Sequence, residues 1–288
     1  MQKSGEILAA RTHGRVRQAS GPYRSWLDIA GAGRSGPVDD RRGWEQMGAA
    51  SGLLATLMFV LAFIVFMTTD PTGGTPYPSI ENAQTVNDFY SQNVNAARLQ
   101  VLFTTLGIAL FLWFLGSLWR VLTEAEGGPA RGATVALVGA GVASALMLVG
   151  LALTYAVLLT TSPAQAAAVP AFFTGSAVLF ALGGGVLSLF FFAVGKVILH
   201  TGVMGRWLGW LALLAAVLSV LAFISPFWVS GILNPATGAL GLWAWWAAFV
   251  VWVLLASSVL TLQEYREVKE SRKAEPGSPV PAAKEAGK

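Results

Sequence analysis

Residues whose side chains could carry out chemistry are few in this chain of 288 residues. Lys196 and His200 lie four residues apart, so both would face the same side of a helix. An ionisable pair buried in a membrane is typical of transport or catalysis. These two residues instead stand at the end of a long apolar stretch, where long polar side chains reach water while their stems stay in lipid. The pair therefore favours an interfacial position over a reaction.

Metal and thiol chemistry have little support in the composition. The sequence contains no cysteine, which excludes disulfides, thiolate nucleophiles and cysteine metal ligands. Its two histidines, His13 and His200, lie far apart in the chain, which argues against a histidine metal centre. The middle of every apolar stretch also lacks Asp, Glu, Lys, Arg and His, which argues against proton-coupled transport and intramembrane proteolysis. We therefore expect no catalytic residue, no metal and no cofactor. These observations favour a non-enzymatic protein and leave a membrane enzyme as an open alternative.

One glycine pattern imitates a cofactor site. Residues 135–144 copy the strand and glycine loop with which dinucleotide-binding folds approach a pyrophosphate. That motif also needs an acidic residue about twenty positions later, and the region around Thr160 has none. The segment lies inside an apolar stretch as well. It therefore predicts no dinucleotide site.

Small residues at four-residue spacing explain this pattern better, because they let helix backbones approach closely within lipid. One such stripe lies in the third apolar stretch and one in the fourth: Gly132, Ala136, Ala140 and Ser144, and Ala177, Ala181 and Gly185. We expect these two spans to form the tightest pair. The run of Gly183, Gly184 and Gly185 has an alternative interpretation, a broken point that exposes helix backbone to a ligand.

The elements that hold these residues are apolar enough to cross a membrane. Hydrophobic residues make up 55% of the chain and charged residues 12%, about half the charged share of a soluble domain. One membrane span needs about 20 apolar residues. The sequence therefore predicts an all-α, polytopic membrane helix bundle with six spans, at residues 48–68, 99–118, 133–159, 171–197, 207–228 and 240–262.

Polar tails are expected on both sides of this six-span domain, which covers residues 48–262. Residues 1–47 are rich in glycine and arginine without helical periodicity, which predicts a disordered N-terminal tail. Alternatively, translation starts at Met47, directly before the first span, and the preceding segment is not part of the native protein. In the C-terminal tail, residues 263–288, we expect the last helix to continue to Lys273 and the remainder to be disordered.

The basic residues predict the orientation. They gather in the two tails and in the loops around residues 120–131 and 196–206, whereas the other three loops hold none before Arg98 at the start of the second span. Because basic residues near span ends favour the cytoplasmic side, we expect both termini in the cytoplasm. This distribution, with a net charge of +4, argues against a nucleic-acid partner. Tryptophans near the span ends are predicted as interfacial anchors: Trp207 and Trp210 inside, and Trp228, Trp243, Trp245 and Trp246 outside.

The loop before the second span carries an amphipathic segment. Apolar residues of segment 86–97 recur at three- and four-residue steps, which predicts a short helix on the membrane surface or over the end of the bundle. This segment has two interpretations: a helical extension of the next span, or a lid or recognition element. In the second interpretation, Phe89 and Tyr90 are the anchors of an external recognition surface.

Two segments resemble a known family. The heptapeptide Gly-Arg-Trp-Leu-Gly-Trp-Leu at residues 205–211 is similar to the start of the fifth span in uncharacterised multi-helix integral membrane proteins of high-GC Gram-positive bacteria, grouped as a domain-of-unknown-function family. The pattern Leu-Trp-Phe-Leu-Gly-Ser-Leu at residues 112–118, followed by Arg120 and Glu126, resembles the end of their second span. Those proteins often have Pro where this chain has Gly205. The resemblance covers residues 48–262 and implies six helices in the bacterial inner membrane, without an assigned activity or site.

Three functional hypotheses remain open. The first is a non-enzymatic inner-membrane protein that contacts other proteins or lipids through Phe89 and Tyr90. The second is a carrier or binder of a small apolar molecule, and the third is a membrane enzyme. The first two differ because a carrier needs a cavity near the membrane midplane, whereas a scaffold is packed solid there. The candidate pocket of the second hypothesis is formed by Thr154, Tyr155, Ser176, Gly183, Gly184 and Gly185.

Overall fold

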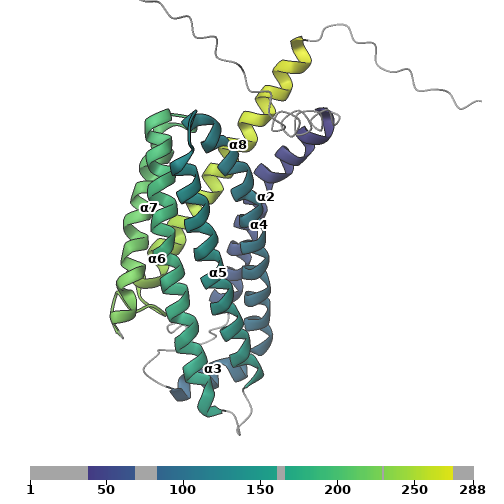
Figure 1. Ribbon diagram of the computed structural model, residues 1–288. Helices are drawn as coiled ribbons and strands as arrows, with labels where there is room; N and C mark the ends of the chain where they lie inside the picture. The colour runs from purple at the N-terminus through teal and green to yellow at the C-terminus, as the bar shows by residue number, and fades with distance from the viewer. Residues whose placement is uncertain (1–37, 69–82, 161–165, 229, 275–288) are drawn as a thin grey trace, which may run out of the picture. The chain divides into compact units, whose positions relative to one another are not determined.

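Six long helices form a membrane bundle in the computed structural model of the chain (Figure 1). The structure describes residues 38–68, 83–160, 166–228 and 230–274. Within these residues all regular structure is helical: α2 (Val38–Met67), α3 (Ala83–Gln92), α4 (Val94–Glu126), α5 (Arg131–Leu159), η1 (Ala166–Ala168), α6 (Val169–Thr201), α7 (Arg206–Ile224), η2 (Ser225–Phe227), the π-helical turn η3 (Ala239–Trp243) and α8 (Ala244–Ala274). Each of the six long helices contains a segment apolar enough to cross a membrane, and the short helix α3 does not. The prediction of an all-α, six-span membrane bundle is confirmed.

The helix ends extend somewhat beyond the predicted spans. α2 begins at Val38, inside the segment predicted as a disordered tail, and α8 continues to Ala274. Gly127 and Gly202 end α4 and α6 in the left-handed conformation, with φ angles of 61° and 75°, which glycine adopts readily at a helix C-cap. The remaining predicted tail residues, 1–37 and 275–288, lie outside the described part of the chain. The bundle described below belongs to the unit that begins at Trp44.

Glycine allows the middle three helices, α5, α6 and α7, to pack closely. A Cβ atom added to Gly139 of α5 would lie 3.1 Å from the backbone nitrogen of Phe190 on α6. A Cβ atom on Gly195 of α6 would lie 3.0 Å from the carbonyl oxygen of Gly209 on α7. Gly209 belongs to the heptapeptide at residues 205–211, so this part of the motif has a packing role. Such close approach is the main source of helix association where lipid is the solvent.

The residues of the two predicted small-residue stripes pack against more than one neighbouring helix. Their alanines and the serine are buried: Ala136, Ala140, Ser144, Ala177 and Ala181. Gly132 faces Val197 of α6 and also Glu126, whose carboxylate accepts hydrogen bonds from the backbone N–H groups at the start of α5. Gly185 faces α7, where an added Cβ atom would lie 2.5 Å from the Cβ atom of Phe223. The second stripe therefore serves α7 as well as α5.

Aromatic side chains fill the middle of the bundle. Phe190 of α6 makes edge-to-face contacts with Phe111 of α4 and Trp252 of α8, at ring-centroid distances of 6.0 and 5.5 Å. Phe249 lies 5.0 Å from Phe111 and 5.4 Å from Phe59 of α2. All five rings are buried. The void beside them measures about 20 Å³, room for about one water molecule, so this level of the bundle is nearly solid.

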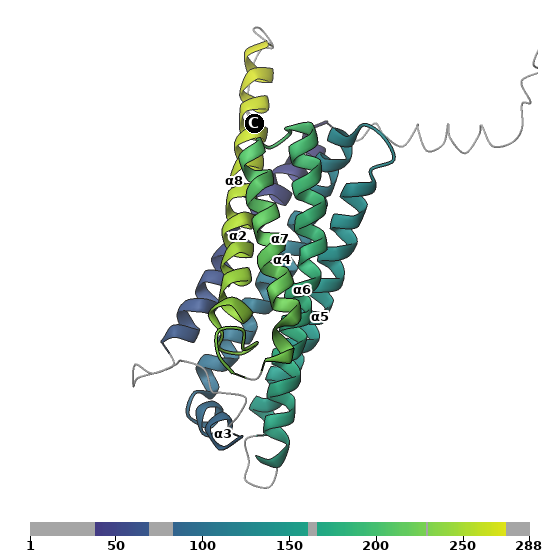
Figure 2. The same cartoon turned by 90° about the vertical axis from the view of Figure 1, so that its left-hand side faces the viewer.

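The short helix α3 lies crosswise at the end of the bundle away from the C-terminal end of α8 (Figures 1 and 2). Its residues Val86 and Tyr90 are buried against Val157 of α5 and Phe173 of α6. At Asn93 the backbone leaves the helical conformation, with φ −117° and ψ 26°, before α4 begins. Residues 86–92 therefore belong to a separate helix, whereas residues 94–97 form the start of α4, so the interpretation as a helical extension of the second span is right only for the last part of the segment.

Candidate functional site

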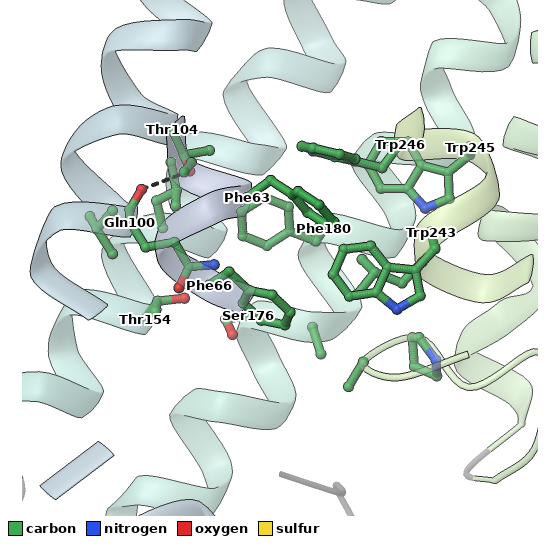
Figure 3. Close-up of a pocket in the computed structure, with 17 residues that line it drawn as sticks. Phe63, Phe66, Gln100, Thr104, Thr154, Ser176, Phe180, Trp243, Trp245 and Trp246 are labelled. Carbon is green, nitrogen blue, oxygen red and sulfur yellow. Dashed lines mark hydrogen bonds between the residues drawn. The ribbon is translucent and has the colours of Figure 1, made fainter. Parts of the chain in front are cut away.

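A pocket of about 110 Å³ lies between the helices in the half of the bundle next to α3 (Figure 3). Its walls come from five long helices, from η3 and from the loop before η3: Ala62, Phe63, Phe66, Gln100, Val101, Thr104, Leu151, Thr154, Ser176, Ala177, Phe180, Pro235, Ala236, Leu242, Trp243, Trp245 and Trp246. An apolar cavity of about 150 Å³ can hold a benzene molecule, whereas drug-sized ligands occupy about 300 Å³ or more. The pocket therefore suits a short alkyl chain or a group somewhat smaller than an aromatic ring.

The pocket has a polar wall and an aromatic wall (Figure 3). Gln100 and Thr104 of α4, Thr154 of α5 and Ser176 of α6 gather on one side. The other side is built mainly from six rings: Phe63, Phe66, Phe180, Trp243, Trp245 and Trp246. None of the described residues that line the pocket carries a charge. These walls favour an uncharged ligand that is mostly apolar and bears one polar group.

The aromatic wall is held together by its own ring contacts. Phe63 stacks on Trp246 with a centroid distance of 5.3 Å and an interplanar angle of 28°. Trp243 packs against Phe63 at 5.6 Å and against Phe66 at 5.2 Å. Because these rings already constrain one another, little side-chain freedom remains to be lost when a ligand binds.

The loop before η3 and the π-helical turn itself fix the tryptophans at the pocket. The Asn234 side-chain oxygen accepts hydrogen bonds from the N–H groups of Ala236 and Thr237, at 2.8 and 3.0 Å. The loop then folds back so tightly that a Cβ atom on Gly241 would clash with the Asn234 carbonyl oxygen. The indole N–H of Trp245 donates to the Gly241 carbonyl at 3.0 Å. π-Helical turns inside α-helices are frequent at functional sites.

The structure brings together only part of the pocket predicted from the sequence. Thr154 and Ser176 lie in its polar wall, whereas Tyr155 is 44% exposed and is not among the lining residues. The three glycines pack against large side chains instead: Gly183 against Met147, Gly184 against Trp245, and Gly185 against Phe223. α6 runs through all three glycines as one unbroken helix. The alternative interpretation of this run as a broken point is therefore wrong.

Several site residues were missed by the sequence analysis. Gln100 is a side-chain amide within an apolar span, and that placement alone could have indicated it, because such groups tend to seek hydrogen-bond partners. Trp245 is 1% exposed, so its prediction as an interfacial anchor is wrong. The pocket walls also include Trp243 and Trp246, which local sequence spacing does not connect with α2 or α4.

The proposed recognition residues on α3 also differ from each other. Tyr90 is 0% exposed and its ring lies 6.0 Å from that of Phe173 on α6. Phe89 is half-buried and packs at the edge of the same cluster. Tyr90 therefore holds α3 against the bundle, and only Phe89 has surface left for an external partner.

A second cleft, of about 470 Å³, lies at the opposite end of the bundle. Its walls carry both signs of charge, from Arg120, Glu124, Glu264 and Arg266. The Arg120 Nε atom and the Glu124 carboxylate form an exposed ion pair at 2.8 Å. Among the described lining residues two positive and two negative charges are present, so these residues favour neither an anion nor a cation. The pocket beside α3 is the more specific site.

No protein-family model, curated protein or solved structure matches this chain. The function is therefore inferred from the walls of the pocket and from the membrane architecture alone.

Proposed function

We propose that this multi-pass membrane protein binds a small, uncharged, mainly apolar molecule in the pocket beside α3. The combination of walls carries the proposal: aromatic rings face an amide and hydroxyl groups, and no described lining residue is charged. Ligand pockets commonly combine apolar walls with a few placed polar groups in this way. Burying an unpaired ion in such surroundings would cost several kcal/mol, so a neutral ligand is favoured.

The position of the pocket along the axis of the bundle supports binding without transport. Its lining residues lie toward the α3 end of each helix, for example Gln100 near the start of α4 and Thr154 near the end of α5. The middle of the bundle is filled by Phe111, Phe190 and Trp252. A ligand that entered at the α3 end would meet these rings before the other side. The absence of a wide cavity at midplane level among the described residues favours a binder over a carrier.

The proposed orientation places the pocket in the outer leaflet. Within the described residues, most basic side chains stand at the end of the bundle away from α3: Arg120, Arg131, Lys196, Arg206, Arg266 and Lys269. The α3 end carries Arg98 alone among described basic residues. Basic residues favour the cytoplasmic side, so both termini are proposed to be cytoplasmic. The resemblance at residues 205–211 supports placement in a bacterial inner membrane.

Contact with another membrane protein is the function that the binding proposal replaces. It depended on Phe89 and Tyr90 together, and the burial of Tyr90 leaves Phe89 alone. A non-enzymatic role is retained, because binding requires no reacting group. Loss of a co-purifying protein in Phe89→Ala, with no ligand in the pocket, would restore the interaction hypothesis.

Photolabelling tests the proposal directly. The full chain, purified in lipid nanodiscs, is irradiated with a five-carbon alkyl probe that bears a diazirine, and the adducts are mapped by mass spectrometry. We expect adducts concentrated on pocket residues such as Thr154 and Trp243. Ala177→Leu fills the pocket and is expected to remove them, whereas Ala152→Leu, on the exposed face of α5, makes the same change outside it. Adducts spread evenly over lipid-facing residues in all three proteins would contradict the proposal.

A further inference from the structure

We infer that the pocket selects a molecule whose polar group, a hydroxyl or a primary amide, both donates and accepts a hydrogen bond. Gln100 is the residue that recognises this group. This inference rests on the proposed binding function and adds the chemical class of the ligand. It follows from which hydrogen-bonding capacity of the polar wall is already used and which is free.

The hydroxyl hydrogens of the polar wall are already used. Thr154 donates to the Gly150 carbonyl at 3.1 Å, and Ser176 donates to the Phe173 carbonyl at 2.8 Å. A hydroxyl oxygen keeps acceptor capacity after it has donated its only hydrogen. Thr154 and Ser176 can therefore accept a hydrogen bond from a ligand but have none left to give. The indole N–H of Trp245 is likewise committed, to Gly241.

Gln100 has the complementary capacity. Its backbone carbonyl accepts a hydrogen bond from Thr104 at 2.8 Å, but no hydrogen bond of its side-chain amide is found within the described part of the chain. Figure 3 shows this amide reaching from α4 into the space between the polar wall and the aromatic rings. The amide offers two N–H groups and one carbonyl oxygen, whichever way it is turned. An amide without a partner in an apolar surrounding is costly, so a ligand that satisfies it gains affinity.

A hydroxyl group matches this arrangement at both of its atoms. Its oxygen can accept from the Gln100 amide while its hydrogen is donated to the oxygen of Thr154 or Ser176. An ether of the same length can only accept, and an alkane can do neither. A carboxylate would meet no basic side chain, and an ammonium group would meet no acidic side chain, among the described lining residues. The aromatic rings nevertheless attract cations, so a quaternary ammonium compound is the alternative ligand class to be tested against the alcohol.

Competition experiments distinguish these classes of ligand. The photolabel is the alkyl diazirine probe described above, called the headless probe because it has no polar group apart from the diazirine. Unlabelled 1-pentanol and butyl methyl ether contain the same numbers of carbon and oxygen atoms. They are compared with pentanoate and pentyltrimethylammonium at equal measured concentrations in the nanodisc bilayer. One satisfied hydrogen bond contributes about tenfold in affinity, so 1-pentanol is expected to displace the probe at about tenfold lower concentration than the ether. Gln100→Leu is expected to weaken competition by 1-pentanol and by the ether about tenfold each, because both accept from the Gln100 amide, and to leave labelling by the headless probe in place. Gln263→Leu, which loses a glutamine at the other end of the bundle, is expected to leave competition by both compounds unchanged.

The outcomes distinguish the two proposals. If the headless probe labels the pocket but the alcohol and the ether compete equally, the ligand class is wrong and the binding function stands. Strongest competition by pentyltrimethylammonium also overturns the ligand class, in favour of a cation. If Gln100→Leu leaves competition by 1-pentanol and by the ether unchanged, Gln100 is not the residue that recognises the polar group. If no probe labels the pocket, the binding function itself fails.

Discussion

The half of the bundle next to α3 and the middle of the bundle are built from similar residues with opposite results. Both are rich in Phe and Trp, but in the middle the rings of Phe190 and Phe111 meet at their edges and leave a void of about 20 Å³. Next to α3, the rings of Phe63, Trp243 and Trp246 meet in stacked and edge-to-face pairs and leave one side of the space to Gln100 and three hydroxyl groups. Aromatic content alone therefore does not distinguish a core from a site. The amide and the hydroxyl groups opposite the rings do.

The largest difference in the free energy of unfolding is expected between two Phe→Ala substitutions, one in the middle of the bundle and one in the pocket wall. Phe190→Ala removes a fully buried ring with several aromatic neighbours and is expected to lower the free energy of unfolding by about 3 kcal/mol. Phe63→Ala borders space that is already empty and is expected to cost about 1 kcal/mol while weakening probe binding. Equilibrium unfolding in mixed micelles measures both. Equal losses would show that the two regions do not differ in packing.

Helix packing gives the next largest effect. Gly185→Val places side-chain atoms against the Cβ and Cα atoms of Phe223, which cannot move without α7, and is expected to destabilise the bundle by about 2 kcal/mol. Gly141→Val is the matched control, because nothing lies within 4 Å of a Cβ atom there. Its effect is expected to stay within about 0.5 kcal/mol. A fully tolerated Gly185→Val would mean that α6 and α7 are not held together at this point.

A smaller and local effect is expected at the loop before η3. Asn234→Ala removes the acceptor for the N–H groups of Ala236 and Thr237, and water can replace part of it, so the loss is expected to be about 1.5 kcal/mol. Hydrogen exchange is expected to accelerate across residues 234–243 and to remain unchanged in α5. Acceleration throughout the bundle would instead make this loop part of the common core.

The smallest effect concerns the end of the bundle away from α3. Glu126→Ala removes the carboxylate that caps the start of α5 and is expected to lower the melting temperature by an amount equivalent to about 1 kcal/mol. Glu124→Ala, two residues earlier, breaks only the exposed ion pair with Arg120 and is expected to cost about 0.3 kcal/mol. If the order of these two losses were reversed, the capping role assigned to Glu126 would be wrong.

The sequence contained most of the fold and little of the site. Six spans follow from the lengths of the apolar stretches, because a chain segment surrounded by lipid has few conformations other than a helix that satisfy its backbone hydrogen bonds. The amphipathic spacing of segment 86–97 likewise indicated α3, although burial of Tyr90 depends on α6 and could not be read locally. Thr154 and Ser176 could be predicted as pocket residues because a hydroxyl residue inside an apolar span can be identified from the sequence alone. The rest of the pocket depends on which faces of five helices meet, and spacing within one helix does not determine that.

The π-helical turn η3 makes the pocket sensitive to the number of residues as well as to their types. Such a turn closes its hydrogen bonds over one residue more than an α-helical turn, and one residue corresponds to about 100° of rotation around the helix axis. A chain that lacks Leu240 of this turn would keep every wall residue. Its loop and its tryptophans, however, would no longer face the same space. Single-residue insertions and deletions at this turn are therefore a natural route by which chains of this architecture could gain or lose a binding site without a change of side chain.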